Sequence, residues 1–382
     1  MPNAGSVNSQ PEYGHRRTLV TKLVIENLKH RPVRTLLTVL AIGLQVTLVL
    51  TIVGLSRGVL ETSRTRTRGV GADLMVRPPG SAIIGMTSAP MQEGVVQFVE
   101  KQQHVALAQG VMIHPVGGLD SITGIDIDRF NQMSGGLRYI QGGPFQQRTD
   151  MLVDEQYARQ KNLKIGQVHE LANMKWTIRG IVESGKLART FVQMPVLQEV
   201  TSNTGKISQV YVKVDDPKNL QPVVASLKKQ LEGYQIYSMD EFLSYVSVEG
   251  VPGLSPFIAV IVGLSVVFGF LVVFLAMYTA VLERTREIGI LKALGASPGY
   301  VVGMLLRETV LIAIIGCVAG IAMAFLSRWA ITAFVPASLP VIIVPDWWWR
   351  AALIALAGSV LGALYPGLKA AKQDTIEALA YE

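Results

Sequence analysis

The side chains best suited to catalysis or metal binding are few and widely spaced. No pair of histidines has the spacing of an HExxH motif or of another zinc site. The five histidines are His15, His30, His104, His114 and His169. The single cysteine, Cys317, lies within an apolar run, so neither a disulfide nor a CxxC redox pair is predicted. We therefore expect no catalytic and no metal-binding residues.

One segment, Gly295-Ala-Ser-Pro-Gly299, matches the G-x-S-x-G pattern of a serine nucleophile. That pattern requires a turn between a strand and a helix, whereas here it separates a charged helix from an apolar run. A glycine that ends one helix, with Ser297 capping the next and Pro298 opening it, explains the same residues better. No phosphate-binding loop is found, because residues 205–208 (GKIS) lack the upstream glycine. We expect no cofactor in this chain, and any ATP would be bound by another chain.

The elements that carry these residues are dominated by apolar runs. Of 382 residues, 49% are hydrophobic and only 16% are charged, and the mean hydropathy is +0.36, whereas a soluble domain has about 25% charged residues. Four stretches lack charge entirely: residues 35–55, 257–282, 309–326 and 351–368. As helices they would rise about 27 to 39 Å against a hydrocarbon core of roughly 30 Å. We predict four transmembrane helices, although the two shorter runs could also be buried core helices.

The distribution of positive charge predicts the orientation of the spans. Residues 241–255, before the second span, hold no Lys or Arg, whereas Arg284, Arg286 and Lys292 follow it. Because positive loops stay inside, residues 283–297 are predicted to be cytoplasmic, and so are both termini. The first span has the features of an uncleaved signal anchor. Although the net charge is +7, no compact basic domain with interleaved aromatic residues predicts nucleic-acid binding.

Two flanking segments suit the membrane surface. Residues 17–30 have apolar and charged faces at helical spacing, which fits an amphipathic helix on the inner surface or a solvated helix. Residues 346–349, Asp-Trp-Trp-Trp, fit an aromatic belt at the outer interface or a cluster that packs on the outer domain.

The segment between the first two spans, residues 56–256, is predicted to be an α+β domain outside the membrane. Residues 209–215 alternate as a strand, residues 219–231 have helical spacing, and a second strand surrounds residues 234–237. These form a strand-helix-strand unit. Further short strands are predicted at residues 73–76, 119–127, 151–153 and 175–182.

The spans contain packing motifs and few polar groups. Gly316 with Gly320, and Gly358 with Gly362, form GxxxG patterns that allow helices to approach closely. Gln45, Arg307 and Glu308 are the notable polar residues, which disfavours independent ion-coupled transport.

Residues 283–294 are predicted to form a short charged cytoplasmic helix that docks on a soluble protein, or else lies on anionic lipid. The helical spacing allows i, i+3 ion pairs between Glu283 and Arg286 and between Arg284 and Glu287. Three apolar side chains, Ile288, Leu291 and Leu294, are the predicted anchors in the partner.

The run ERTREIGILKALGAS, residues 283–297, resembles the cytoplasmic loop of FtsX-like permeases of the MacB type in ABC transporters. Similarity extends to NLKHRPVRTLLTVLAIG at residues 27–43, GADLMV at 71–76, GIDIDRF at 124–130, YPGLKAA at 365–371 and IEAL at 376–379. One departure is Asp374-Thr375, where the family often has Asp-Pro. The resemblance covers nearly the whole chain.

The resemblance implies a stand-alone permease subunit of the plasma (inner) membrane that forms a homodimer or pairs with a related permease. A separate ATPase subunit would bind ATP and magnesium and couple through Glu283, Arg284, Arg286, Glu287, Ile288, Leu291 and Leu294. The helices would transmit motion to a MacB-like periplasmic core domain for export. A periplasmic adaptor would be a further partner. The alternative is a non-transporting FtsX-like regulator that activates a cell-wall hydrolase. Neither the cargo nor the choice of homodimer or heterodimer follows from the sequence.

The corresponding segments are a cytoplasmic N-terminus (1–34), a first span (35–55), the outer core domain (56–256), a second span (257–282), the coupling loop (283–297), a third span (298–326), an outer loop (327–350), a fourth span (351–368) and a cytoplasmic C-terminus (369–382).

Overall fold

The computed structural model describes residues 32–81, 89–117, 120–251, 253–334 and 340–373. The predicted amphipathic helix at residues 17–30 and the IEAL segment at 376–379 lie outside these ranges. The described residues divide into a helical unit, within residues 32–54, 256–330 and 343–373, and a sheet unit, within residues 55–255 and 331–342.

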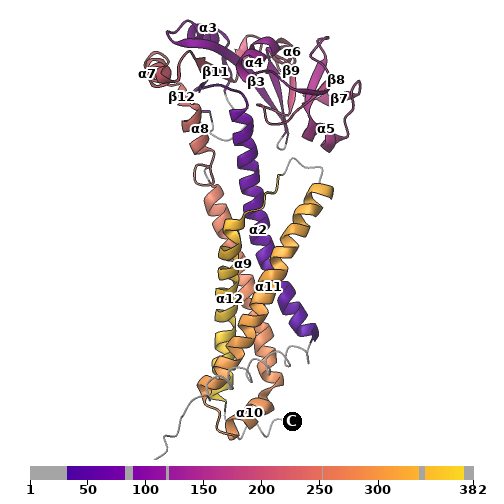
Figure 1. Ribbon diagram of the computed structural model, residues 1–382, viewed down its shortest axis with the longest axis vertical. Coiled ribbons are helices and arrows are strands. Elements are labelled where there is room, and N and C mark those ends of the chain that lie inside the picture. The colour runs from indigo at the N-terminus through magenta and orange to yellow at the C-terminus, as the bar shows by residue number, and fades with distance from the viewer. Residues whose placement is uncertain (1–31, 82–88, 118–119, 252, 335–339, 374–382) are drawn as a thin grey trace, which may run out of the picture. The chain divides into compact units, whose positions relative to one another are not determined.

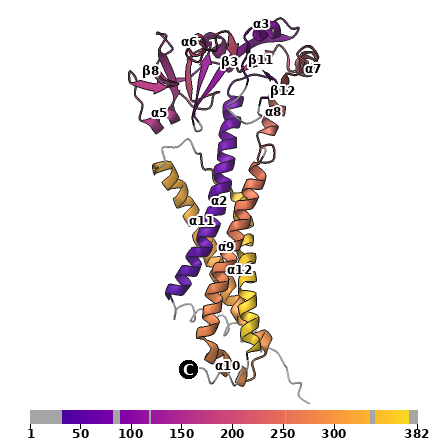
Figure 2. The same cartoon turned by 180° about the vertical axis from the view of Figure 1, so that it is seen from behind.

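Four long helices can cross a membrane by length and composition (Figures 1 and 2). They are α2 (Pro32–Arg68), α9 (Leu254–Glu283), α11 (Pro298–Phe334) and α12 (Pro345–Lys372). A short helix, α10 (Thr285–Ala293), lies between α9 and α11. The four-helix prediction is confirmed, and each helix is longer than its charge-free run because polar residues at both ends continue the helical backbone.

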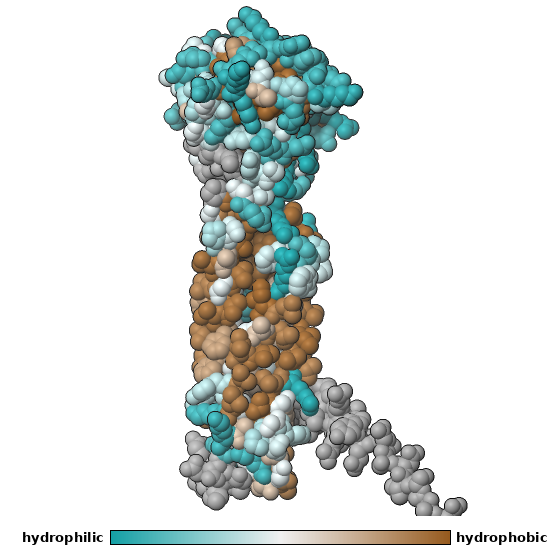
Figure 3. All heavy atoms as spheres, turned by 90° about the vertical axis from the view of Figure 1, so that its left-hand side faces the viewer, coloured by the Kyte–Doolittle hydropathy of each residue, from teal (hydrophilic) through white to brown (hydrophobic). Residues whose placement is uncertain are grey.

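The surface of the helical unit is apolar where a bilayer would surround it. Figure 3 shows a brown belt over these helices, with hydrophilic residues beyond it. On α9, Val260, Leu264 and Phe268 are all more than half exposed. In α9 only 22% of the most apolar window is buried inside the chain. Side chains of this kind are stable at the surface when lipid covers them.

The sheet unit is built on a mixed ten-stranded sheet with the order β12-β1-β11-β3-β4-β9-β6-β8-β5, and β7 also pairs with β8. Its strands are β1 (Leu74–Arg77), β3 (Val105–Gly117), β4 (Asp120–Ile125), β5 (Tyr139–Gly142), β6 (Asp150–Asp154), β7 (Val168–Leu171), β8 (Met174–Val182), β9 (Thr190–Gln193), β11 (Gln209–Val214) and β12 (Gln235–Ser238). A separate pair joins β2 (Met91–Gln92) to β10 (Lys206–Ile207).

Short helices cover both faces of this sheet. They are α3 (Gly94–Glu100), α4 (Ile127–Ser134), α5 (Glu155–Lys161), α6 (Met194–Val200), η1 (Pro217–Asn219), α7 (Leu220–Gln230) and α8 (Met239–Tyr245). Val210 and Val212 of β11 pack in one core with Leu227 of α7, whereas Tyr211 points to a second core with Phe242 of α8. Alternate residues thus serve opposite faces, and the predicted α+β domain is confirmed.

The predicted strand-helix-strand unit is present as β11, α7 and β12. Its two strands are not neighbours, because β1 lies between them and pairs antiparallel with both. Residues 74–77 therefore connect β11 to β12 within the sheet, although they precede β11 by more than a hundred residues in the chain.

Candidate functional site: the helix junction at α10

The turn between α9 and α10 occurs at one residue. Arg284 has φ −111° and ψ 15°, outside the helical region, between the last residue of α9 and the first of α10. Thr285 Oγ1 donates to the carbonyls of Val281 (3.1 Å) and Leu282 (3.0 Å) at the end of α9, and the Val281 carbonyl also accepts from the backbone N–H of Arg284 at 3.2 Å. The side chain of Arg284 points inward at this break and is 7% exposed.

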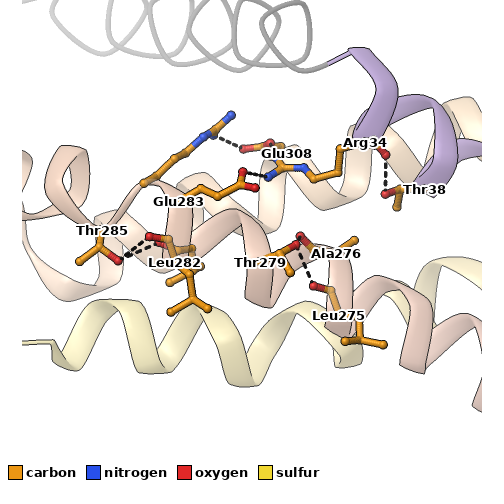
Figure 4. Close-up of polar contacts among 11 residues, drawn as sticks. Arg34, Thr38, Leu275, Ala276, Thr279, Leu282, Glu283, Thr285 and Glu308 are labelled. Atoms are coloured by element: carbon orange, nitrogen blue, oxygen red, sulfur yellow. Dashed lines mark hydrogen bonds and ion pairs between the residues drawn. The ribbon is translucent and has the colours of Figure 1, made fainter. Parts of the chain in front are cut away.

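The start of α2, the α9–α10 turn and α11 meet in one ion-pair network, shown in Figure 4. Arg284 Nη1 lies 3.2 Å from Glu308 Oε2 on α11, and Arg34 Nη2 from α2 lies 3.8 Å from Glu308 Oε1. Arg34 Nη1 also donates to Glu283 Oε2 at 3.2 Å. Two arginines and two glutamates thus connect α2, the α9–α10 junction and α11.

The centre of this network is buried. The side chain of Glu308 is 1% exposed, and those of Arg284 and Arg34 are 7% and 21% exposed. A buried carboxylate is stable only when cations and hydrogen bonds compensate its lost hydration. Because each oxygen of Glu308 faces a different arginine, a displacement of α10 relative to α2 or α11 disturbs this compensation.

The predicted i, i+3 pairs are corrected by the structure. Among the described residues, Glu283 pairs with Arg34 instead of Arg286, and Arg284 pairs with Glu308 instead of Glu287. The prediction assumed one unbroken helix over residues 283–294. Since the helix breaks at Arg284, the i, i+3 geometry does not hold across that position.

The exposed face of α10 differs from the predicted one. Leu294 is 81% exposed and Ile290 is 46% exposed, with Arg286 and Glu287 exposed beside them. Leu291 is half-buried, and Ile288 is buried against the chain's own helices. Ile290 and Leu294, rather than Ile288, therefore form the apolar surface that a partner could contact, and Arg284 does not belong to an exposed rim.

The end of α10 is tied to the helices that follow it. Lys292 Nζ donates to the carbonyls of Ala371 (3.0 Å) and Gln373 (2.5 Å) at the end of α12. Gly295 has φ +92°, and Ser297 Oγ accepts from the backbone N–H of Tyr300 at 3.3 Å. The helix-end interpretation of the G-x-S-x-G segment is thus confirmed, because Ser297 caps α11.

The two GxxxG motifs lie at helix crossings. A Cβ on Gly320 would lie 2.6 Å from the carbonyl oxygen of Gly43 on α2, and one on Gly316 would lie 2.8 Å from Ile42. On α12, a Cβ on Gly362 would lie 2.7 Å from the carbonyl oxygen of Phe270 on α9. A Cβ on Gly358 would lie 3.7 Å from the carbonyl oxygen of Val266. Three of these four positions therefore require glycine, since a Cβ contact under 3.0 Å is not tolerated without movement.

Sequence reasoning missed three members of the junction. Arg34 was assigned no role, Glu308 was noted only as one of few polar residues in the spans, and Lys292 only as a positive charge. Glu308 carried a usable signal, because an ionisable residue at the end of an apolar run requires a partner. The sequence around Glu308 did not indicate which residues are its partners, since Arg34 and Arg284 lie on other helices.

The junction joins α2, the α9–α10 turn and α11 through charged groups. Its exposed surface is apolar with charged neighbours. Within the described part of the chain, no group of three or more His, Cys, Asp or Glu side chains is placed to hold a metal ion.

Two family models match the chain. The FtsX-like permease C-terminal model matches residues 259–375, and the MacB-like periplasmic core domain model matches residues 35–230, which is more than half of the chain.

Curated relatives agree with these models. The uncharacterized ABC transporter permease YknZ of Bacillus subtilis is 30% identical over 224 residues, covering 57% of this chain and 55% of the relative. The macrolide export ATP-binding/permease protein MacB of Escherichia coli is 22% identical over 399 residues, covering 94% of this chain and 60% of the relative. The matches thus span little more than half the length of these relatives.

Two solved structures match part of the chain. The periplasmic region of MacB from Actinobacillus actinomycetemcomitans has 16% identity and a TM-score of 0.35, covering 45% of this chain and 92% of that one. The extracellular domain of YknZ from Gram-positive bacteria has 14% identity and a TM-score of 0.34, covering 44% and 100%.

Proposed function

The chain belongs to the family of FtsX-like ABC transporter permeases with a MacB-like periplasmic core domain, and on that premise we propose that it couples ATP hydrolysis by a separate ATPase subunit to motion of its sheet unit. The motion would drive export of a substrate from the outer face of the plasma (inner) membrane. In this proposal ATP and magnesium bind to the ATPase subunit, and the chain itself is not an enzyme.

The observation that carries the proposal is the exposure of Leu294, of which 81% is accessible. Leu294 and Ile290 project from a short helix between two membrane helices, with Arg286 and Glu287 beside them. An apolar pair with charged neighbours is the pattern of a helix that enters a groove on a soluble partner.

The ion-pair network supports the second part of the proposal, which is transmission. A force on α10 acts on Arg284 and therefore on Glu308 and Arg34. Arg34 lies at the start of α2, a continuous helix of 37 residues whose residues from 55 onward belong to the sheet unit. At 1.5 Å per residue this helix is about 55 Å long, against a hydrocarbon core of roughly 30 Å. One helical backbone thus contributes to both units.

The remaining parts of the proposal are supported by the family membership and by the distribution of positive charge. Both termini and α10 are cytoplasmic, the sheet unit is outside, and two copies or two related permeases assemble. A periplasmic adaptor is a further possible partner on the outer side.

The test is replacement of Leu294 by Asp in the full-length chain, followed by affinity purification in mild detergent, mass spectrometry of co-purifying chains and an ATPase assay. We expect an ATPase subunit with the unaltered chain, and a loss of roughly tenfold or more in its recovery with Leu294→Asp, because a central apolar contact is replaced by a charge. Phe98→Asp is the matched control, since Phe98 is an exposed apolar side chain of the sheet unit.

The outcomes separate the hypotheses. Equal recovery of the ATPase with Leu294→Asp and Phe98→Asp contradicts docking through α10. Recovery of an ATPase together with a cell-wall hydrolase would favour the non-transporting regulator. A helical circular-dichroism spectrum and a single gel-filtration peak show that each variant is folded.

A further inference from the structure

An arginine lies between two indole rings where α12 begins. The Cζ atom of Arg350 is 5.5 Å from the ring centre of Trp347 and 5.4 Å from that of Trp349. Both distances are within the range of a cation–π contact, which orients the guanidinium without neutralising its charge. The planar group is thus held in place with its N–H donors available.

No carboxylate among the described residues forms an ion pair with Arg350. The indole N–H of Trp347 is also buried without an acceptor in the described part of the chain. An arginine and a neighbouring indole therefore supply donors and a positive charge, and no ion pair with a described carboxylate, Asp346 one turn earlier included, takes up that charge. This imbalance indicates a ligand with negatively charged oxygen atoms.

The surroundings identify the environment of that ligand. Trp349 is 58% exposed, and Leu353, one turn further along α12, is 55% exposed. On α11, Trp329 and Leu326 are 59% and 61% exposed. The ring of Trp348 packs edge-on against Phe325 of α11, with centroids 6.0 Å apart, which holds this end of α12 on α11. Exposed tryptophans at the end of an apolar helix are typical of the depth of lipid headgroups.

We propose that Arg350 binds the phosphate of a phospholipid, with Trp347 and Trp349 orienting the guanidinium and the acyl chains lying along Leu353. The phosphate is the anion that a bilayer presents at headgroup depth, and a guanidinium can bind two of its oxygens at once. The exposed apolar side chains on this end of α12 and on α11 favour a lipid over a free anion, because they would otherwise face water. This site rests only on the helices spanning a bilayer and is independent of the proposed coupling to an ATPase.

The first measurement uses the unaltered full-length protein. Native mass spectrometry in detergent would compare phosphatidylglycerol with diacylglycerol of the same acyl chains, which lacks the phosphate. We expect the affinity of the first phosphatidylglycerol to exceed that of diacylglycerol by at least about tenfold, the factor of one charge-assisted contact. Equal affinities would overturn the proposal, and this result does not depend on any variant folding.

Variants then locate the site. Arg350→Gln should lower the affinity for the first phosphatidylglycerol about tenfold, and Arg350→Lys should lower it less, because the charge remains without the planar donors. Lys369→Gln is the matched control, since Lys369 is a cation at the other end of α12 that lies 5.0 Å from the ring centre of Tyr278. An equal loss in Arg350→Gln and Lys369→Gln would show an effect of net charge alone and would overturn the site.

A third arm separates the two sources of phosphate. Excess inorganic phosphate should leave the first phosphatidylglycerol bound, because it gains nothing from Trp349 and Leu353. Complete displacement by inorganic phosphate would overturn the lipid assignment.

Discussion

Glu308 is the residue on which the charge balance of the helix junction depends. Its side chain is 1% exposed, and its two oxygens face Arg284 at 3.2 Å and Arg34 at 3.8 Å. The amide of a glutamine could keep one hydrogen bond at this position, but it would leave the buried guanidinium of Arg284 without its counter-charge, whereas Arg34 would keep its ion pair with Glu283.

We therefore expect Glu308→Gln to destabilise the protein by about 3 to 5 kcal/mol, the cost of leaving a buried charge without its partner. The measurement is the midpoint of thermal unfolding of the purified protein in detergent. Glu283→Gln is the control, because Glu283 is 44% exposed and its ion pair should contribute at most about 1 kcal/mol. Similar unfolding midpoints for the two variants would mean that the network does not hold the helix ends together.

His169 makes the stability of the sheet unit depend on pH. It lies on β7, where its Nε2 is 3.2 Å from the hydroxyl of Tyr157. Burial lowers the pKa of His169, and the nearby positive charge of Lys161 lowers it further. Between the ordinary histidine pKa of about 6.5 and the lower folded-state pKa, the unfolded state binds more protons than the folded state. Stability is therefore complete above about pH 6.5 and is lost as the pH falls through this range.

The expected result is weaker protection of β7 and β8 from hydrogen exchange as the pH falls below about 6.5, after correction for the intrinsic exchange rate. His169→Gln should remove this dependence. Peptides from β1 and β12, which lie at the other end of the sheet, serve as the internal control. An unchanged pH profile in His169→Gln would assign the effect to another group.

At the scale of elements, the helical unit is held by close crossings of helix backbones. At the crossing of α9 and α12, the effect of an added methyl group can be compared at two glycines that have different surroundings. A Cβ on Gly362 would lie 2.7 Å from the carbonyl oxygen of Phe270, and a Cβ on Gly358 would have its nearest neighbour at 3.7 Å.

Gly362→Ala should therefore push α9 and α12 apart and destabilise the protein by roughly 1 to 3 kcal/mol, the usual cost of overpacking. Gly358→Ala should be neutral or stabilising by up to about 1 kcal/mol, since alanine favours the helix. Thermal unfolding of the two variants under the same conditions measures the difference. Equal midpoints would show that the crossing tolerates a methyl group at both positions.

Sequence patterns predicted some strands and missed others for a physical reason. Strand β11 was predicted because residues 209–215 alternate between apolar and polar side chains. Strand β3 was not predicted, although it is the longest strand of the sheet. It pairs with β11 along one half and with β4 along the other, and its central residues are buried on both faces. Such a strand has no alternation, and its glycines and Pro115 resemble turn residues.

At the scale of the whole molecule, the proposed topology places the sheet unit outside the membrane and α10 inside. The single cysteine makes this testable, because Cys317 is buried and can be replaced. In a Cys317→Ser background, Lys101→Cys on the sheet unit should react with a membrane-impermeant maleimide in spheroplasts. Glu287→Cys on α10 should react only after permeabilisation. The opposite labelling pattern would contradict the proposed topology and place α10 outside the membrane.

The sequence by itself determined which segments cross the membrane and that an α+β domain lies between the first two spans. Both follow from local properties, since twenty consecutive apolar residues or an alternating run can be recognised without knowing what they contact. The family resemblance came from the same kind of local run, residues 283–297. The glycines of the two GxxxG motifs could likewise be named, but not their neighbours.

Only the tertiary structure decided which side chains act together. Arg34 and Glu283 form an ion pair although 249 positions separate them, and Arg284 turns inward because the helix breaks at that residue. The nine-residue helix α10 has apolar side chains on more than one face, so its own spacing could not show that Ile288 would be buried and Leu294 exposed. The helices that pack around α10 determine which of its side chains are buried, because burial depends on neighbours that are distant in the sequence.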